Sequence, residues 1–315
     1  MTEAITRNFG EALRAPLRIG ISGRRGVGSR AVTVVVAAAG HPIVAAGEHP
    51  DVRVHVLAEV CKPEDRQVLD CGDVDLVVVN KADLAGLGGD GPMARSRRLA
   101  EQVTATTGVV AVPLAALPAR AAVDEAVVDE QVLTAVRTLV ANPADMSSAD
   151  AFVAGAHPVS AAHRARLVSE LGLFGVAHAV LTVRAEPDAG ADRLRAVFRA
   201  VSGLDGLLDG LAKAGAPARY RRVLAAHQVL EARAVTDADA AEFLHANDTV
   251  LAVMDAAAEV LRAAGVAVTP PSRAPRAQAI RWRRYAAGPV SALHRQCGLD
   301  LARGSLRLLE SGDRA

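Results

Sequence analysis

The stretch DLVVVNKAD, residues 75–83, decides the fold of this chain, because a run of apolar residues ends abruptly in polar ones. Such a continuous apolar run is typical of a strand that is buried on both faces of a parallel sheet. Asn80, Lys81 and Asp83 then fall at the carboxyl end of that strand, which is where open α/β sheets bind ligands. We therefore expect a parallel sheet with a binding loop at the end of this strand.

Short apolar runs alternate with helical segments on both sides of this strand. The expected strands are 17–22, 41–46, 52–60, 74–79 and 109–114, and the expected helices are 29–39, 62–69 and 92–106. This alternation predicts an α/β domain with a doubly wound, mainly parallel sheet over residues 16–120. Residues 1–15 precede it as a separate N-terminal segment.

From about residue 121 the chain changes to long segments rich in Ala, Leu, Val and Arg, with helical spacing and Pro-containing interruptions. Residues 121–315 are therefore expected to form a mainly helical domain with an Arg-rich C-terminal region. Periodicity alone leaves the apolar run 171–183 open between helix and strand, and we expect a helix. Residues 269–276 have the composition of a linker.

A glycine-rich turn, residues 23–30, follows the first expected strand. It consists of Gly23, Arg24, Arg25, Gly26, Val27, Gly28, Ser29 and Arg30. A turn of this kind can direct backbone N–H groups and a helix N-terminus toward an anion such as phosphate. The alternative is a strand-to-helix turn that binds nothing.

Asn80-Lys81-Ala82-Asp83 resembles the base-reading N-K-x-D motif of P-loop GTPases, and Gly23 and Gly28 have the spacing of their G-x-x-x-x-G-K-[ST] loop. The resemblance covers about a third of the chain. It implies that Asp83 accepts hydrogen bonds from guanine, that Lys81 lies along the base, and that the backbone N–H of Ala115 meets the guanine oxygen. A buried carboxylate would reject adenine, which offers it no matching donors. GTP or GDP is the implied ligand.

The phosphate half of the resemblance is degraded. Ser29 stands where GTPases have the phosphate-binding lysine, and Arg30 stands where they have the Ser or Thr that ligates Mg²⁺. An arginine is only a donor, so Mg²⁺ is not expected to be well held. Only 51 residues separate Gly28 from Asn80, and no D-x-x-G follows a strand there, so both switch segments are missing.

These departures favour a pseudo-GTPase, an interaction or regulatory protein without catalytic residues for GTP hydrolysis. The alternative from the same class is a slow but active GTPase that uses Arg24, Arg25 or Arg30 unconventionally. A GTPase-like domain followed by helices also resembles bacterial dynamin-like proteins in architecture, which often occur as paired chains. A protein partner, either a related GTPase chain or a second copy, is therefore expected.

The C-terminal segment 273–307 contains eight arginines and one acid. Within it Arg281, Trp282, Arg283 and Arg284 are candidate contacts with an anionic surface, such as a peripheral membrane contact. The alternative is a packed helix whose arginines pair with acids elsewhere. The net charge of +1 argues against a surface built for nucleic acid.

Composition and Cys usage indicate a globular protein of the cytoplasm, with the inner face of the membrane as an alternative location. Of its 315 residues 51% are hydrophobic, no uninterrupted apolar run is long enough to span a membrane, and the N-terminus lacks a signal-peptide pattern. The three cysteines form no C-x-x-C pair, which predicts neither disulfides nor zinc. His41, His49 and His55 are interpreted as surface or core histidines rather than metal ligands.

Overall fold

The computed structural model describes residues 9–12, 14–45, 47–86, 90–269 and 274–312. Contacts divide the chain into two compact units, one formed by residues 18–211 and the other by residues 1–17 together with 212–315. They are called here the sheet unit and the C-terminal unit. The sheet unit therefore extends well beyond the boundary expected near residue 120.

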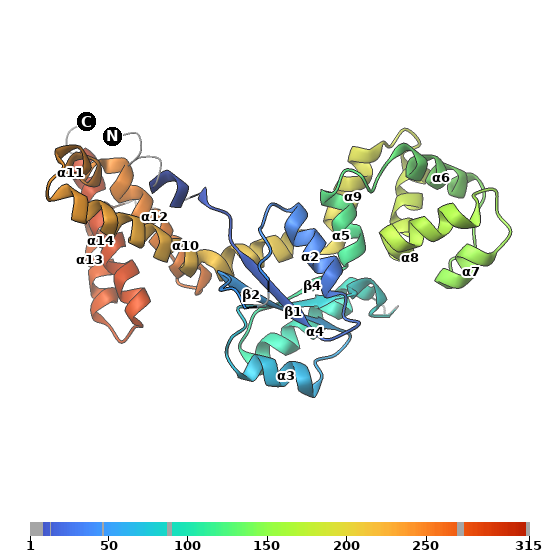
Figure 1. Cartoon of the computed structure of the whole chain (residues 1–315), viewed down its shortest axis with the longest axis horizontal. Helices are drawn as coiled ribbons and strands as arrows, with labels where there is room; N and C mark the ends of the chain where they lie inside the picture. The colour runs from blue at the N-terminus through green and yellow to red at the C-terminus, as the bar shows by residue number, and fades with distance from the viewer. Residues whose placement is uncertain (1–8, 13, 46, 87–89, 270–273, 313–315) are drawn as a thin grey trace. The chain divides into compact units, whose positions relative to one another are not determined.

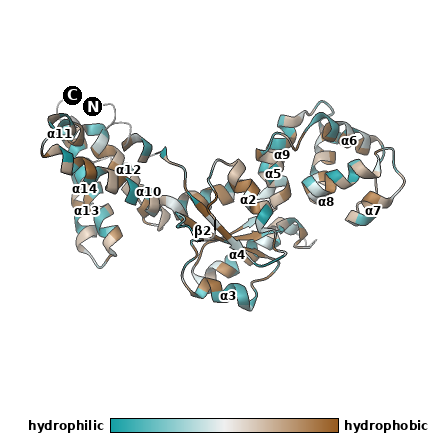
Figure 2. Cartoon of the chain, viewed as in Figure 1, coloured by the Kyte–Doolittle hydropathy of each residue, from teal (hydrophilic) through white to brown (hydrophobic). Residues whose placement is uncertain are grey.

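The sheet unit is built on four parallel strands. They are β1 (Ile19–Gly23), β2 (Val52–Ala58), β3 (Leu76–Asn80) and β4 (Ala111–Leu114), in that order across the sheet. All five residues of β3 are buried, as its apolar sequence predicts. Figure 2 shows the strands of this unit as largely hydrophobic.

Of the strand expected at 41–46, residue 46 lies outside the described residues, and residues 41–45 form a single parallel bridge rather than a strand. This bridge joins Ile43 to Ile19 through hydrogen bonds from Ile19 N–H to the Pro42 carbonyl and from Val44 N–H to the Ile19 carbonyl. Pro42 has no N–H to donate to the Leu17 carbonyl, so the ladder cannot extend on the N-terminal side of this bridge.

Helices lie on both faces of the sheet, as a doubly wound arrangement requires. The helix α2 (Ser29–Ala38) packs against α5 (Ala116–Val123), and α3 (Pro63–Asp70) packs against α4 (Pro92–Thr107). In Figure 1 α2 and α5 lie above the strands and α3 lies below them. The short 3₁₀ helix η1 (Ala82–Leu84) follows β3 directly.

The remaining helices of the sheet unit follow α5 in the sequence. They are α6 (Glu130–Ala141), α7 (Ala149–Ala154), α8 (Ala161–Ala185), α9 (Ala191–Ser202) and the start of α10 (Leu204–Ala234). Both α8 and α9 contact α5, α6 and α7 pack on α8, and a core that includes Phe152, Leu171 and Phe198 joins them. These long-range contacts place residues 121–211 with the sheet. The helix expected at 171–183 is confirmed as part of α8.

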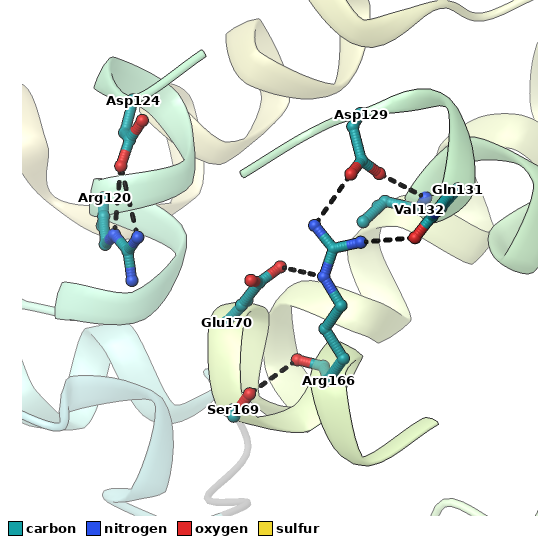
Figure 3. Close-up of polar contacts among 8 residues, drawn as sticks. All are labelled: Arg120, Asp124, Asp129, Gln131, Val132, Arg166, Ser169 and Glu170. Carbon is teal, nitrogen blue, oxygen red and sulfur yellow. Dashed lines mark hydrogen bonds and ion pairs between the residues drawn. The ribbon is translucent and has the colours of Figure 1, made fainter. Parts of the chain in front are cut away.

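Arg166 braces α8 against the N-terminus of α6 (Figure 3). Its guanidinium donates to Asp129 Oδ2 at 2.9 Å and to Gln131 Oε1 at 3.0 Å, and it pairs with Glu170 Oε2 at 3.2 Å. Asp129 also caps α6 by accepting from the Val132 N–H. Burial raises the pKa of Asp129, but the bonds from Val132 and Arg166 outweigh it and lower the pKa overall. The first half of α8 is thereby held in place.

Gly172 breaks α8 two residues beyond Glu170. Its φ of 65° and ψ of 167° are not helical, so α8 consists of two helical segments joined at this residue. Only glycine adopts this backbone conformation without strain.

By length and composition alone, α8 is the one helix in the described part of the chain that would pass as a membrane span. Its residues Leu167, Leu171 and Val176 are fully buried in the core of the sheet unit. Such burial is typical of a core helix in a folded domain, so the membrane evidence from α8 is weak.

The C-terminal unit is helical. It contains the rest of α10, α11 (Ala238–His245), α12 (Asn247–Ala263), α13 (Pro275–Ala287) and α14 (Ala292–Gly312). Its core includes Tyr220, Met254, Leu261, Trp282 and Cys297, and the Tyr220 hydroxyl donates to Asp300.

Replacing Gly203 should destabilise the sheet unit more than replacing a glycine of similar backbone conformation. A Cβ at Gly203 would lie 2.4 Å from the Pro113 carbonyl oxygen and its φ is 82°, whereas Gly108, with φ of 73°, has open space around it. We expect Gly203→Ala to lower the free energy of unfolding by about 3 kcal/mol, and Gly108→Ala by about 1 kcal/mol. Equal urea midpoints for the two variants would contradict this packing.

Candidate functional site

Asn80 joins three chain segments at the carboxyl edge of the sheet. Its side chain is 3% exposed, its Nδ2 donates to the Val27 carbonyl at 2.9 Å, and its Oδ1 accepts from the Ala116 N–H at 3.3 Å. A Cβ at Gly28 would lie 2.5 Å from Nδ2, so only glycine fits beside the amide. The structure therefore brings together the glycine-rich turn, the end of β3 and the start of α5.

The glycine-rich turn has the backbone that its sequence suggests. Gly26 and Gly28 have φ of 89° and 85°, and α2 begins directly after Gly28. A Cβ at Gly23 would lie 2.6 Å from Ser29 Oγ and 2.8 Å from the Val56 carbonyl oxygen. Each of the three glycines is thus required by backbone conformation or by close approach.

The arginines of the turn differ in their surroundings. Arg24 Nε donates to Asp65 Oδ2 at 2.7 Å, so this guanidinium is held by α3. Arg25 and Arg30 are exposed. The Ser29 hydroxyl is buried and has no hydrogen-bond partner among the described residues. The position of the phosphate-binding lysine therefore carries a short neutral side chain.

Asp83 lies beside the break in α8. Its Oδ2 is 3.6 Å from the position that a Cβ on Gly172 would take. Burial raises the pKa of Asp83 above its usual value, opposed by its own backbone N–H and by the charge of Lys81. Lys81 itself has a left-handed backbone, with φ of 58°. Sequence patterns had given no sign that α8 reaches this carboxylate.

The backbone N–H of Ala115 is not free. It donates to the Ser202 carbonyl at 2.8 Å, and Ala115 is fully buried. This corrects the expectation that Ala115 offers its N–H to a guanine oxygen, because the C-terminal end of α9 takes the bond. A contact between residues so far apart in sequence leaves no local signal.

A cavity of about 510 Å³ opens on the α4 side of the same edge. Its lining includes Lys81, Leu84, Arg95 and Leu99. Neither Asp83, Ala115 nor the glycine-rich turn contributes to it. The cavity is therefore not the space in which the resemblance would place guanine and phosphate together.

Three residues that the sequence analysis did not single out together form a chain of hydrogen bonds. Ser22 Oγ lies 3.0 Å from His55 Nδ1, and His55 Nε2 lies 3.0 Å from Asp65 Oδ1. Burial raises the pKa of Asp65, but the bonds from His55, Arg24 and the Lys62 N–H outweigh it and lower the pKa overall. The sequence did carry one indication of this contact. The alternation of side chains along β2 places Arg53 and His55 on the same face of the sheet.

The Arg-rich segment departs from the expected contact surface at Trp282, whereas Arg281 is exposed. Trp282 is 2% exposed and belongs to the core of the C-terminal unit, so it cannot meet an anionic surface. Arg281 lies over the Trp282 ring at 4.8 Å and donates to the Ala267 carbonyl at 2.7 Å. Arg283 and Arg284 are exposed. Trp282 was a candidate surface contact because three arginines flank it, and its burial agrees with the alternative of a packed helix.

Comparison with known proteins found no matching family model, no matching curated protein and no matching solved structure. Among the described residues there is no group of three or more His, Cys, Asp or Glu side chains placed to hold a metal ion.

Replacing the Asn80 amide should destabilise the sheet unit. Asn80→Ala removes two buried hydrogen bonds and leaves the Val27 carbonyl and Ala116 N–H unpaired, so we expect a loss of about 2–4 kcal/mol. The exposed Asn142 is the matched control, and Asn142→Ala should change the stability by about 0.5 kcal/mol or less. Similar urea unfolding curves for the two variants would show that the Asn80 bonds contribute little.

Asp65 should make the stability of the sheet unit pH-dependent on the acid side. Because its folded pKa is lowered, its stabilisation is complete above the unfolded pKa of about 3.9 and is lost as the pH falls through the folded value. Asp65→Asn should therefore cost about 2–4 kcal/mol at pH 7 and progressively less below about pH 4. Urea denaturation of both proteins across this range measures the difference, which a purely steric role would leave constant.

Proposed function

We propose that this chain is a GTPase-like interaction or regulatory protein that acts through a protein partner and does not hydrolyse GTP. The N-K-x-D sequence, the parallel sheet and the link from Asn80 to the glycine-rich turn support the GTPase-like assignment. The contacts of Ala115 with Ser202 and of Arg24 with Asp65 support the loss of GTP hydrolysis.

The bond from the Ala115 N–H to the Ser202 carbonyl is the observation that carries this proposal. The GTPase resemblance assigns this N–H to the guanine oxygen, yet the chain satisfies it internally. Gly172 lies beside Asp83, the other residue assigned to the base. A guanine nucleotide would have to displace a helix terminus before it could make the expected contacts.

The residues present do not fit a complex of GTP with Mg²⁺. Ser29 supplies no charge, Arg30 cannot ligate a metal, and Arg24 is paired with the buried Asp65. Any binding of GTP or GDP is therefore weak and independent of Mg²⁺ in this proposal. A slow GTPase would have to rely on the exposed Arg25 and Arg30.

A related GTPase chain or a second copy of this chain is the partner that we favour, and we place the protein in the cytoplasm. The exposure of Arg283 and Arg284 supports a second candidate function, binding to an anionic membrane surface through α13. Nucleic acid is not an expected partner, since the net charge is only +1.

A nucleotide titration tests the loss of GTPase chemistry. Purified protein is titrated with GTP, GDP and ATP, with and without Mg²⁺, and phosphate release is followed. We expect no multiple turnover and no increase in affinity on adding Mg²⁺. Multiple turnover that disappears in Asp83→Asn would contradict the proposal.

The stability of Asp83→Asn provides a second readout in the same experiment. Because burial disfavours the ionised carboxylate, removing its charge should leave the fold as stable or raise its stability by about 0.5 kcal/mol. Asp73→Asn, at a carboxylate that is 78% exposed, is the matched control with no expected change. Thermal unfolding without nucleotide measures both.

A further inference from the structure

Ser22, His55 and Asp65 form one continuous hydrogen-bonded chain. Ser22 and His55 are paired positions on the adjacent parallel strands β1 and β2, so their side chains lie on the same face of the sheet. Asp65 reaches them from α3, with 3.0 Å between Ser22 Oγ and His55 Nδ1 and 3.0 Å between His55 Nε2 and Asp65 Oδ1. This series of hydrogen bonds thus ends at the Ser22 hydroxyl, near the carboxyl edge of the sheet.

The carboxylate fixes the tautomer of the imidazole. The lowered pKa of Asp65 keeps it ionised at neutral pH, and an ionised carboxylate only accepts hydrogen bonds. Nε2 of His55 must therefore carry the proton that it donates to Asp65. In the neutral ring Nδ1 is then an acceptor, and at 3.0 Å it is nearer to the Ser22 hydroxyl than the Val54 carbonyl oxygen, at 3.4 Å.

Of these three hydrogen-bonded side chains, Ser22 is the one that solvent reaches. His55 is 3% exposed and Asp65 is fully buried, whereas Ser22 is exposed. Arg24 Nε and the Lys62 N–H donate to Asp65 Oδ2 at 2.7 and 3.0 Å, which balances its charge and holds it in place. A nucleophile in contact with solvent, a buried base and a third group that orients the base are the three parts of a serine-activating site.

We propose that Ser22 is an acyl-accepting nucleophile, with His55 as its general base and Asp65 as the positioning residue. Ser22 Oγ attacks the carbonyl carbon of an ester while its proton passes to His55 Nδ1. The tetrahedral intermediate expels the alcohol, which takes that proton, and leaves an acyl ester on Ser22. Water then attacks the acyl carbonyl, gives a proton to His55, and releases the carboxylic acid as Ser22 regains its proton.

Small acyl esters are the substrate class that this position suits. The Ser22 hydroxyl is exposed at the end of a strand, and Gly23 follows it without a side chain. A compact acyl group can reach such a hydroxyl without a deep cavity. The proposal uses neither Asp83 nor Ala115 and shares only the Arg24–Asp65 pair with the function proposed above.

Covalent labelling tests the proposal on the full-length protein. The protein is treated with a fluorophosphonate probe and, separately, with p-nitrophenyl acetate. Mass spectrometry should place the phosphonyl and acetyl groups on Ser22, with a burst of p-nitrophenolate during acetylation. Ser22→Ala should abolish labelling, and His55→Gln should slow it by about 100-fold or more.

Ser160 provides the matched control. Its Oγ lies 2.8 Å from His163 Nδ1, and in the described part of the chain no carboxylate pairs with that histidine. Ser160 should remain unlabelled, and Ser160→Ala should label on Ser22 at the unchanged rate. Absence of label on Ser22, or equal labelling rates in His55→Gln and the parent protein, would overturn the proposal.

Ser22→Cys supplies a second readout, because it keeps a nucleophilic atom at position 22 in the form of a thiol. A thiol beside His55 Nδ1 should react with iodoacetamide at least about 10-fold faster than the exposed Cys71 at pH 7, because the imidazole promotes the thiolate. Equal reactivity of the two thiols would show that His55 does not act as a base toward position 22.

Discussion

The buried amide of Asn80 is the interaction on which the carboxyl edge of the sheet depends. An amide both donates and accepts, so one side chain satisfies the Val27 carbonyl and the Ala116 N–H, which follow β1 and β4 at the two ends of the strand order. The loss of either bond would leave a buried polar group unpaired, at a cost well above the net value of one hydrogen bond. These bonds need no nucleotide. Asn80 therefore has a structural role even where Ser29 and Arg30 stand in place of phosphate and metal contacts.

The helices after the sheet are coupled to the same edge through α5. Ala116 begins α5 and binds Asn80, while the preceding Ala115 N–H binds the Ser202 carbonyl at the end of α9. Arg166 fixes the first half of α8, and the break at Gly172 then brings that helix beside Asp83. Two of the groups that the GTPase resemblance assigns to guanine thus lie against helices of the same chain. The bond to Ser202 stabilises the fold, because the buried Ala115 N–H would otherwise lack a partner.

Local sequence patterns predicted the strands and helices around Asn80 because apolar periodicity is a short-range property. At the expected strand 41–46 an equally local feature, the missing N–H of Pro42, limits the pairing on the N-terminal side of the Ile43 bridge. Contacts between distant segments were not predictable: the Ala115 bond and the burial of Trp282 both depend on helices that pack from far along the chain. His55 was interpreted only as a surface or core residue. Its two partners come from a neighbouring strand and a following helix, a relation that requires the strand register.

The ion pair between Arg24 and Asp65 connects the glycine-rich turn with the hydrogen bonds that end at Ser22. A carboxylate as buried as Asp65 needs charged or hydrogen-bonding partners, and Arg24 is the cation of the glycine-rich turn that supplies them. The same bond withdraws that cation from any phosphate above the turn. It also occupies Asp65 Oδ2, while Asp65 Oδ1 stays with His55 Nε2. One carboxylate thus engages the cation of the turn and orients the imidazole that faces Ser22.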